Sequence, residues 1–146
     1  MDAIKYYKMI RNSVQLYDAE LVSMNCINQS GKKTGGDVNV PIILQREVKV
    51  VSDEKAEIFL RSQIGGEECP FLFDVVYRGS CISFIDLDKN ALEQYAYDQV
   101  VPLLLPYVRE CVASTMARMG LPIFTIPTMD ILDSMEANSS AEDTQE

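Results

Sequence analysis

The sequence predicts an α+β fold in which a four-stranded antiparallel sheet carries helices on one face. Three observations support this prediction. Apolar and polar residues alternate with a period of two in successive segments of the first two thirds of the chain. The turns between the later segments are too short for the crossovers of a parallel sheet. A long helix with a wide apolar stripe follows, and that stripe must be buried against another surface.

The first part of the chain is predicted to hold a short helix, a strand and a polar connection. Residues 2–12 place Ile4 and Tyr7 on one side of a helix that is too short to be stable without packing. Residues 14–26 are rich in strand-forming side chains. The glycine-containing segment 28–37 is too long for a tight hairpin, so we expect a flexible connection there.

Three more strands are predicted from clear alternation. Turns at 52–54 and 65–67 join them, so they form an antiparallel meander with one covered face. Gly79 lies inside the last strand, where glycine often marks a bulge, and strand character resumes through Phe84 and Ile85. The side chains expected on one face are Ile42, Leu44, Val48 and Val50, then Ala56, Ile58, Leu60 and Ile64, then Phe71, Phe73, Val75 and Tyr77.

Prolines and a glycine delimit the main helix. Residues 86–90 offer N-cap side chains for a helical stretch over 91–99, and a kink or break is expected near Pro102. A stretch of about four turns then has Pro102 and Pro106 in its opening turn and ends at Gly120, a left-handed cap. Its apolar stripe consists of Leu104, Val108, Cys111, Val112, Thr115 and Met119.

The C-terminal part is predicted to contain an extended crossover, a short helix and an acidic tail. Two prolines bracket the apolar segment 121–127, so it cannot be helical. Thr128 caps a short helix, and residues 137–146 lack apolar periodicity, as a disordered tail does. We therefore predict one domain over 1–136, made of a helical extension (1–12), the sheet (13–88) and the helices with the crossover (89–136).

Charge and hydropathy exclude several classes of function. The net charge is -9, and residues 65–146 carry 14 acidic but only 4 basic side chains, which disfavours nucleic acid and favours basic partners. The longest apolar run, 100–108, is far shorter than the roughly 20 residues of a membrane-spanning helix. The N-terminus mixes charges into its apolar residues, unlike a signal peptide. We expect a cytoplasmic protein without membrane insertion.

Residues for catalysis or metal binding are scarce. The chain has no histidine, and its four cysteines form no Cys-x-x-Cys pair, so we expect no metal site, no cofactor and no disulfide framework. Cys111 lies on the apolar stripe, where a cysteine is most often an inert small hydrophobe. The carboxylate pairs at 53–54 and 67–68 lie in predicted turns and are explained as solvated charges. We expect no enzymatic activity.

Apolar residues also occur where a monomer covers them poorly. Phe59, Leu72 and Val76 fall on the more polar sheet face, and the segment 122–127 is an apolar loop. A contiguous apolar surface marks an interface or a binding groove. The pattern alone leaves two interpretations open, a loop covered in a homo-oligomer and a groove for client polypeptides.

Several motifs resemble the SecB family of protein-export chaperones. The helix segment Pro106-Tyr-Val-Arg-Glu-Cys111 and the Gly120-x-Pro122 that follows are similar to the family's signature helix and proline-containing crossover. Upstream, Phe71-Leu-Phe-Asp-Val75 is similar to a family strand, with Gly79 at its interrupted end. Tyr17, Glu20 and Leu21 match the pattern of the first strand.

The resemblance implies an ATP-independent chaperone that assembles as a dimer of dimers and holds unfolded polypeptides or preproteins in apolar grooves beside the sheet. Residues expected to line such a groove are Ile42, Leu44, Phe124, Ile126, Leu132 and Met135. The N-terminal helical segment departs from the family pattern and could redirect assembly.

The resemblance also implies partners. Family members deliver clients to the SecA motor, and the positions that match the SecA-binding face are Glu20, Leu72 and Asp74; a second acidic position of the family corresponds to Met24. Some SecB-like proteins instead guard an antitoxin. Two other classes stay open on the residues alone, an oligomeric scaffold for one folded partner and an enzyme or small-ligand carrier.

Overall fold

The computed structural model describes residues 2–32 and 40–126 and confirms the α+β class. Seven elements follow one another along the chain: α1 (Ala3–Ser13), β1 (Val14–Asn28), the short 3-10 helix η1 (Ser30–Lys32), β2 (Ile42–Val50), β3 (Lys55–Gly65), β4 (Phe71–Ser83) and α2 (Lys89–Met119). The helix predicted after Thr128 and the tail predicted over 137–146 lie outside the described residues.

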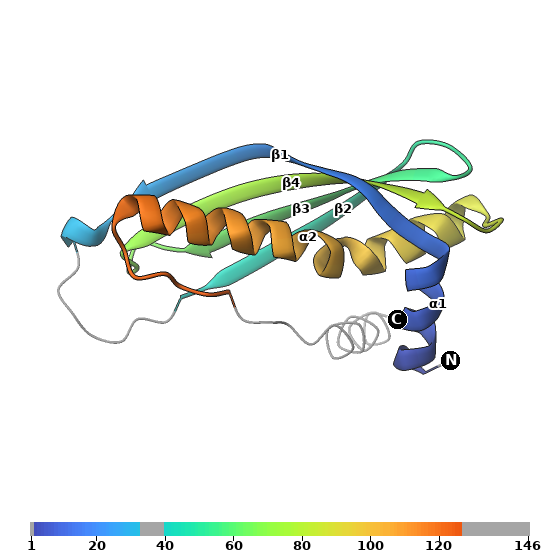
Figure 1. The fold of residues 1–146 in the computed structure, drawn as a ribbon, viewed down its shortest axis with the longest axis horizontal. Coiled ribbons are helices and arrows are strands. Elements are labelled where there is room, and N and C mark those ends of the chain that lie inside the picture. The colour runs from blue at the N-terminus through green and yellow to red at the C-terminus, as the bar shows by residue number, and fades with distance from the viewer. Residues whose placement is uncertain (1, 33–39, 127–146) are drawn as a thin grey trace, which may run out of the picture.

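The four strands form one antiparallel sheet in the order β1-β4-β3-β2, so β1 and β2 are its edges. The predicted meander of the last three strands is confirmed. α2 lies along one face of this sheet (Figure 1). We call this the helix face and the opposite side the outer face.

Alternation along the strands builds the core as the sequence predicts. In β3 and β4 every side chain expected on the helix face is buried, and in β2 the four expected residues are half-buried against the core. α2 supplies the other layer, because its fully buried residues pack onto the strands. These are Leu92, Ala96, Val100, Leu104, Val108 and Val112.

Gly79 is not a bulge, so that prediction is wrong. Its register is regular, because it pairs with Ala19 on one side and Ile58 on the other. A Cβ atom at this position would lie 2.7 Å from Leu16 Cδ1 and 3.1 Å from a side-chain carbon of Leu104. The glycine therefore lets α2 and β1 pack closely on the sheet.

β4 also ends earlier than predicted. The strand stops at Ser83, and Phe84 and Ile85 are exposed beyond it. The Ser83 hydroxyl donates to the carbonyl of Ile85 at 2.7 Å and accepts from the Ile85 N–H at 3.3 Å. This local side-chain turn replaces strand pairing at that point.

The register shifts lie on β1 instead, at Tyr17 and Val22. Directly paired residues of antiparallel strands point to the same face, so the pairing shows which way each side chain points. Glu20 pairs with Arg78 on the outer face, whereas Met24 pairs with the buried Val75 on the helix face. Because Val22 is an extra residue in β1, the alternation of side chains between the two faces changes phase at this point.

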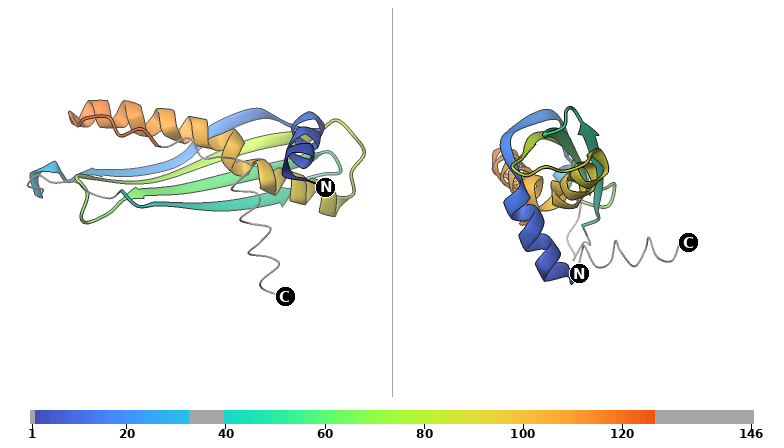
Figure 2. Two further views of the ribbon diagram at one scale, coloured as in Figure 1. Left: turned by 90° about the horizontal axis from the view of Figure 1, so that it is seen from below. Right: turned by 90° about the vertical axis from the view of Figure 1, so that its right-hand side faces the viewer.

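α2 is one continuous helix, so of the predicted kink or break near Pro102 the break is absent, and the two prolines do not lie in an opening turn. The predicted caps are confirmed. The Asp88 side chain accepts from the Ala91 N–H at 2.7 Å, and Gly120 closes the helix with φ 74°. Pro102 and Pro106 lie inside it. Leu104, Leu105, Val108 and other residues on both sides of the prolines are buried, and this packing offsets the missing N–H groups. The helix bends along its course (Figure 2), as expected for internal prolines.

By length and composition alone α2 could cross a membrane, as can the core helix of a soluble protein. Of its most apolar stretch, 44% is buried inside the molecule. Packing against the sheet therefore accounts for part of the apolar composition of this helix.

α1 forms as predicted and projects from one end of the molecule (Figure 1). It is attached to the first half of α2 through Tyr6, whose ring packs edge-on against Tyr95 with centroids 5.6 Å apart. The Tyr6 hydroxyl donates to the Asp98 carboxylate, and burial together with this bond raises the Tyr6 pKa. The Gln99 side chain also donates to the Val14 carbonyl at 3.1 Å, where β1 begins.

Candidate functional site

α2 crosses the sheet diagonally. In the first third of the helix, Arg46 of β2 donates to the Tyr97 carbonyl at 3.5 Å, while at its C-terminal end Asn28 of β1 donates to the Met119 carbonyl at 3.2 Å. The helix thus moves from the β2 edge towards the β1 edge. At this end of the molecule the chain turns back as the extended crossover segment, residues 121–126.

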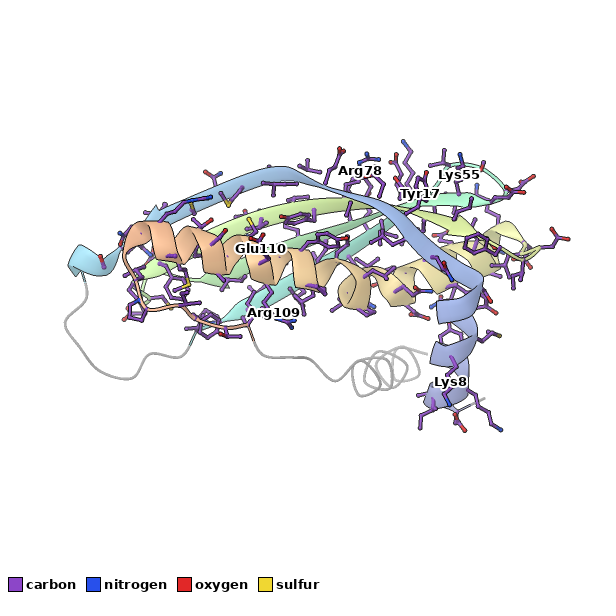
Figure 3. The ribbon with its side chains drawn as sticks, in the orientation of Figure 1. Lys8, Tyr17, Lys55, Arg78, Arg109 and Glu110 are labelled. Carbon is purple, nitrogen blue, oxygen red and sulfur yellow. The ribbon has the colours of Figure 1, made fainter. Side chains whose placement is uncertain are left out.

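Two contacts with α2 hold the crossover segment. Arg109 Nε donates to the carbonyl of Ile126 at 3.1 Å, and the Phe124 N–H donates to the Met116 sulfur at 3.4 Å. In Figure 3 Arg109 lies beside the end of this segment. The Phe124 ring also packs against Phe71 of β4, with centroids 5.9 Å apart.

The structure places four of the six predicted groove residues around the core, and their role in binding stays a prediction. Ile126 is fully buried and Phe124 is half-buried, so the crossover segment fills space against the sheet. Ile42 and Leu44 are half-buried on the helix face of β2. Leu132 and Met135 lie outside the described residues.

Alternation within the crossover segment exposes a residue that the sequence analysis did not select. Phe124 and Ile126 point inward, whereas Ile123 is 57% exposed. The period-two pattern of an extended chain could have identified it, because Ile123 has the opposite parity to Phe124.

Arg46 was also missed. It occupies the helix-face parity of β2, between Leu44 and Val48, and all three are half-buried. Its guanidinium carbon lies 4.0 Å from the centroid of the Tyr97 ring. The sequence signal was a cation at an apolar position of an alternating strand. We call the helix-face side chains of this edge the β2 strip: Ile42, Leu44, Arg46, Val48 and Val50.

A buried hydroxyl lies next to this strip. Ser62 pairs with Leu44 and with Val75, both on the helix face, and is fully buried. Its Oγ has no hydrogen-bond partner within residues 2–32 and 40–126. Such a group costs free energy, which makes it an exception in an otherwise apolar layer.

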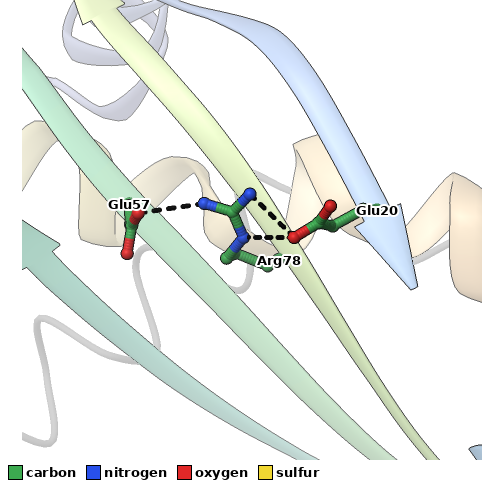
Figure 4. Close-up of polar contacts among 3 residues, drawn as sticks. All are labelled: Glu20, Glu57 and Arg78. Atoms are coloured by element: carbon green, nitrogen blue, oxygen red, sulfur yellow. Dashed lines mark hydrogen bonds and ion pairs between the residues drawn. The ribbon is translucent and has the colours of Figure 1, made fainter. Parts of the chain in front are cut away.

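The three predicted SecA-binding residues share the outer face, yet the charges of Glu20 and Asp74 are already paired. Asp74 accepts from Arg61 at 3.0 and 2.7 Å, and this arginine lowers the pKa of the carboxyl. Arg78 lies between Glu20 and Glu57, at 2.7 and 2.9 Å (Figure 4). SecA binding at this face stays a prediction.

Leu72 and Met24 are the other two residues that bear on the predicted SecA-binding face. Leu72 is half-buried on the outer face and pairs with the exposed Ile27. Met24 does not belong to this face, because the β1 register shift turns it towards α2. The position that was aligned with the family's second acidic residue therefore does not lie on the outer face of this sheet.

The β1 edge exposes more large apolar side chains than any other strand of the described chain. One of them, Met24, contacts Cys111, while Tyr107 of α2 is also exposed, beside Tyr77. The apolar residues exposed on β1 are Tyr17, Leu21, Val22, Met24 and Ile27.

Cysteines and carboxylates are among the potentially reactive groups in the part of the chain that the structure describes. No cluster of three or more histidine, cysteine, aspartate or glutamate side chains could hold a metal ion among these residues. The four cysteines form no disulfide with one another, and Cys69, Cys81 and Cys111 are buried. Desolvation raises the Cys81 pKa to about 12, so this thiol is protonated at neutral pH.

Comparison with known proteins finds likeness in structure alone. No family model and no curated sequence matches the chain. The SecB-like chaperone Rv1957 of Mycobacterium tuberculosis, in complex with a ChAD peptide from the HigA1 antitoxin Rv1956, matches with a TM-score of 0.64 at 16% identity, over 88% of this chain and 98% of that protein. A Streptococcus agalactiae protein of unknown function has a TM-score of 0.48 at 11% identity, over 79% of this chain and 97% of the other. The chain therefore has a SecB-like fold, as its motifs predicted.

Proposed function

We propose that this chain is an ATP-independent cytoplasmic chaperone that holds extended, unfolded polypeptide segments against the β2 strip and the crossover segment. One observation carries the proposal. The chain shares its fold with nearly the whole length of a SecB-like chaperone that binds a peptide. The half-buried strip on an edge strand is consistent with it.

Binding at this place requires no reaction. β2 has a free backbone edge in the described sheet, to which an extended segment can add as a further strand. Apolar client side chains then bury area against the strip, at about 25 cal/mol for each square ångström before ordering costs. The proposed lining is Ile42, Leu44, Phe124, Ile126, Leu132 and Met135.

The crossover segment regulates access in this proposal. Phe124 and Ile126 fill the space against the sheet, so a client that contacts them must displace the segment. The Arg109–Ile126 and Met116–Phe124 contacts are then lost. A client therefore has to supply at least as much apolar contact as the segment itself provides.

Two client classes fit the proposal. The family resemblance favours preproteins delivered to SecA for export. The antitoxin peptide bound by the Mycobacterium tuberculosis neighbour favours a guarded antitoxin. SecA binding is the property that distinguishes these two client classes.

We further propose that copies of the chain associate along β1, as the first step towards a dimer of dimers. β1 is a long edge strand with several exposed apolar residues, a feature that monomeric proteins avoid. The neighbouring Tyr107 extends the apolar surface onto α2. Light scattering coupled to size-exclusion chromatography should show an oligomer that Leu21→Asp disrupts.

Suppression of aggregation tests the chaperone proposal. Chemically denatured citrate synthase is diluted with and without the protein, in the absence of nucleotide, and its aggregation is followed by light scattering. The protein should suppress this aggregation. Ile123→Asp should weaken the suppression, whereas Ile85→Asp, at an isoleucine 48% exposed elsewhere, should not. Phe124→Asp should abolish it without changing the oligomer. A wild-type protein that fails with several unrelated denatured substrates and binds one folded partner would support the scaffold alternative.

A further inference from the structure

Three strand arginines differ in their surroundings. Arg61 and Arg78 lie on the outer face, and each pairs with carboxylates at 3.0 Å or less. Arg46 lies on the helix face of edge strand β2, and no carboxylate among residues 2–32 and 40–126 forms an ion pair with it. Among these three strand arginines, the half-buried Arg46 is thus the one without a described anion.

The position of Arg46 is fixed by Tyr97. The guanidinium lies over the aromatic ring at 4.0 Å and reaches the Tyr97 carbonyl at 3.5 Å. A cation over a ring is attracted by its π electrons, but a planar guanidinium still has several N–H groups to donate. Arg46 is therefore oriented and half-buried, which favours binding of a carboxylate by two parallel hydrogen bonds.

The register of β2 defines what lies around that carboxylate. Leu44 and Val48 flank Arg46 at two residues on either side and point to the same face. A strand added to the free edge of β2 would place one side chain opposite Arg46 and the side chains two residues away opposite Leu44 and Val48.

We propose that Arg46 selects client segments in which an aspartate or glutamate lies between two aliphatic residues, each two positions away. This inference rests on the proposed function and specifies its client class. The net charge of -9 disfavours acidic segments over the molecule as a whole, so a preference for an acidic residue has to come from the local contact with Arg46. Arg46 thus sets the register of a bound segment as well as its composition.

Fluorescence anisotropy with designed peptides tests the proposal on the full chain. The first probe is fluorescein-labelled Ile-Ser-Ile-Ser-Asp-Ser-Ile-Ser-Ile, and the matched probes carry asparagine or lysine at the centre. Wild type should bind the aspartate probe about tenfold more tightly than the asparagine probe, since one charge-assisted bidentate pair is gained. The lysine probe should bind most weakly.

Variants of the protein distinguish a loss of selectivity among the peptides from a loss of folding stability. Arg46→Gln should bind the aspartate and asparagine probes equally, and Arg46→Glu should prefer the lysine probe. Arg61→Gln, on the outer face, should retain the wild-type order. Because the readout is the ratio between probes, a general loss of affinity in a less stable variant does not mimic the result.

Two results would overturn the inference. One is equal wild-type affinity for the aspartate and asparagine probes, which would leave the chaperone proposal standing. The other is an Arg46-dependent preference for a peptide of residues 129–135, where Asp133 lies between Ile131 and Met135, over the aspartate probe; this would assign the site to the chain's own C-terminal segment. Failure of all probes together with failure to suppress aggregation would instead reject the proposed function.

Discussion

The thiol of Cys111 on α2 donates to the thioether of Met24 on β1, with the two sulfur atoms 3.4 Å apart. Met24 thus faces the helix, although Glu20, four residues earlier, faces the opposite side. In a regular strand two residues of equal parity share a face. Val22 is the extra residue between them, and it determines which side chains of β1 reach the core.

Deletion of Val22 should destabilise the protein. Without the extra residue the second half of β1 slips by one position, which turns Met24 and Cys26 to the outer face. We expect the free energy of unfolding in urea to fall by about 1–3 kcal/mol, because the half-buried Cys26 and the contact of Met24 with Cys111 are lost from the helix face. Val22→Thr should stay within about 0.5 kcal/mol of wild type. A deletion variant as stable as wild type would show that the shift is dispensable.

Gly79→Ala should also destabilise the fold, through overpacking. The added methyl would meet Leu16, Ile58 and Leu104 at 2.7–3.1 Å. We expect a loss of about 1–3 kcal/mol in urea unfolding. The matched variant is Gly31→Ala, where no atom lies within 4 Å, and it should be near neutral. Equal stability of both variants would contradict close packing at Gly79.

Ser62→Ala should be neutral or stabilising, unlike most core substitutions. The hydroxyl is buried without a described partner, so its removal relieves a desolvation cost and leaves no group unpaired. We expect a change between zero and about +1 kcal/mol in the free energy of unfolding. A clear loss of stability would reveal a hydrogen bond made by this hydroxyl.

Alkaline pH should destabilise the protein through Cys81. Burial raises the pKa of its thiol from 9.0 to about 12, so the folded state retains a proton that the unfolded state loses. The corresponding stability is present below pH 9 and is lost as the pH rises towards 12, by up to about 1.4 kcal/mol for each pH unit. Urea unfolding from pH 8 to 11 should show a shallower decline for Cys81→Val than for wild type. Parallel declines would assign the effect to other groups.

Asp74→Lys should abolish SecA binding if the outer face is the docking site. The probe is a synthetic peptide of the basic zinc-bearing SecA tail with zinc bound, measured by calorimetry at low and high salt. Because Arg61 already neutralises Asp74, Arg61→Ala should tighten binding. Binding unchanged by both substitutions would exclude this face and favour the antitoxin route.

Much of the sheet was predictable because its signals are local. Alternation in β3 and β4 identified the buried residues, and Asp88 and Gly120 delimited α2 as cap residues do. The position of β1 was also predicted. Its faces were not, because a register shift depends on pairing with β4, which lies about sixty residues away along the chain.

The candidate site was predicted only in part. The sequence identified the crossover segment as apolar and non-helical, yet it could not show that Phe124 packs on Phe71 while Ile123 is exposed. Arg46 was visible as a break in the apolar alternation. Its place over Tyr97 depends on the diagonal course of α2 across the sheet.

The sequence by itself determined the α+β class, the order of the elements and the layer of side chains that forms the core. Those properties follow from periodicity and capping, which act over a few residues. Only the tertiary structure decided that α2 continues through Pro102 and Pro106, that Met24 faces α2 and that the crossover segment packs against the helix face of the sheet. Each of these outcomes is set by packing between segments distant in the chain, where the free energy of burial outweighs local preference.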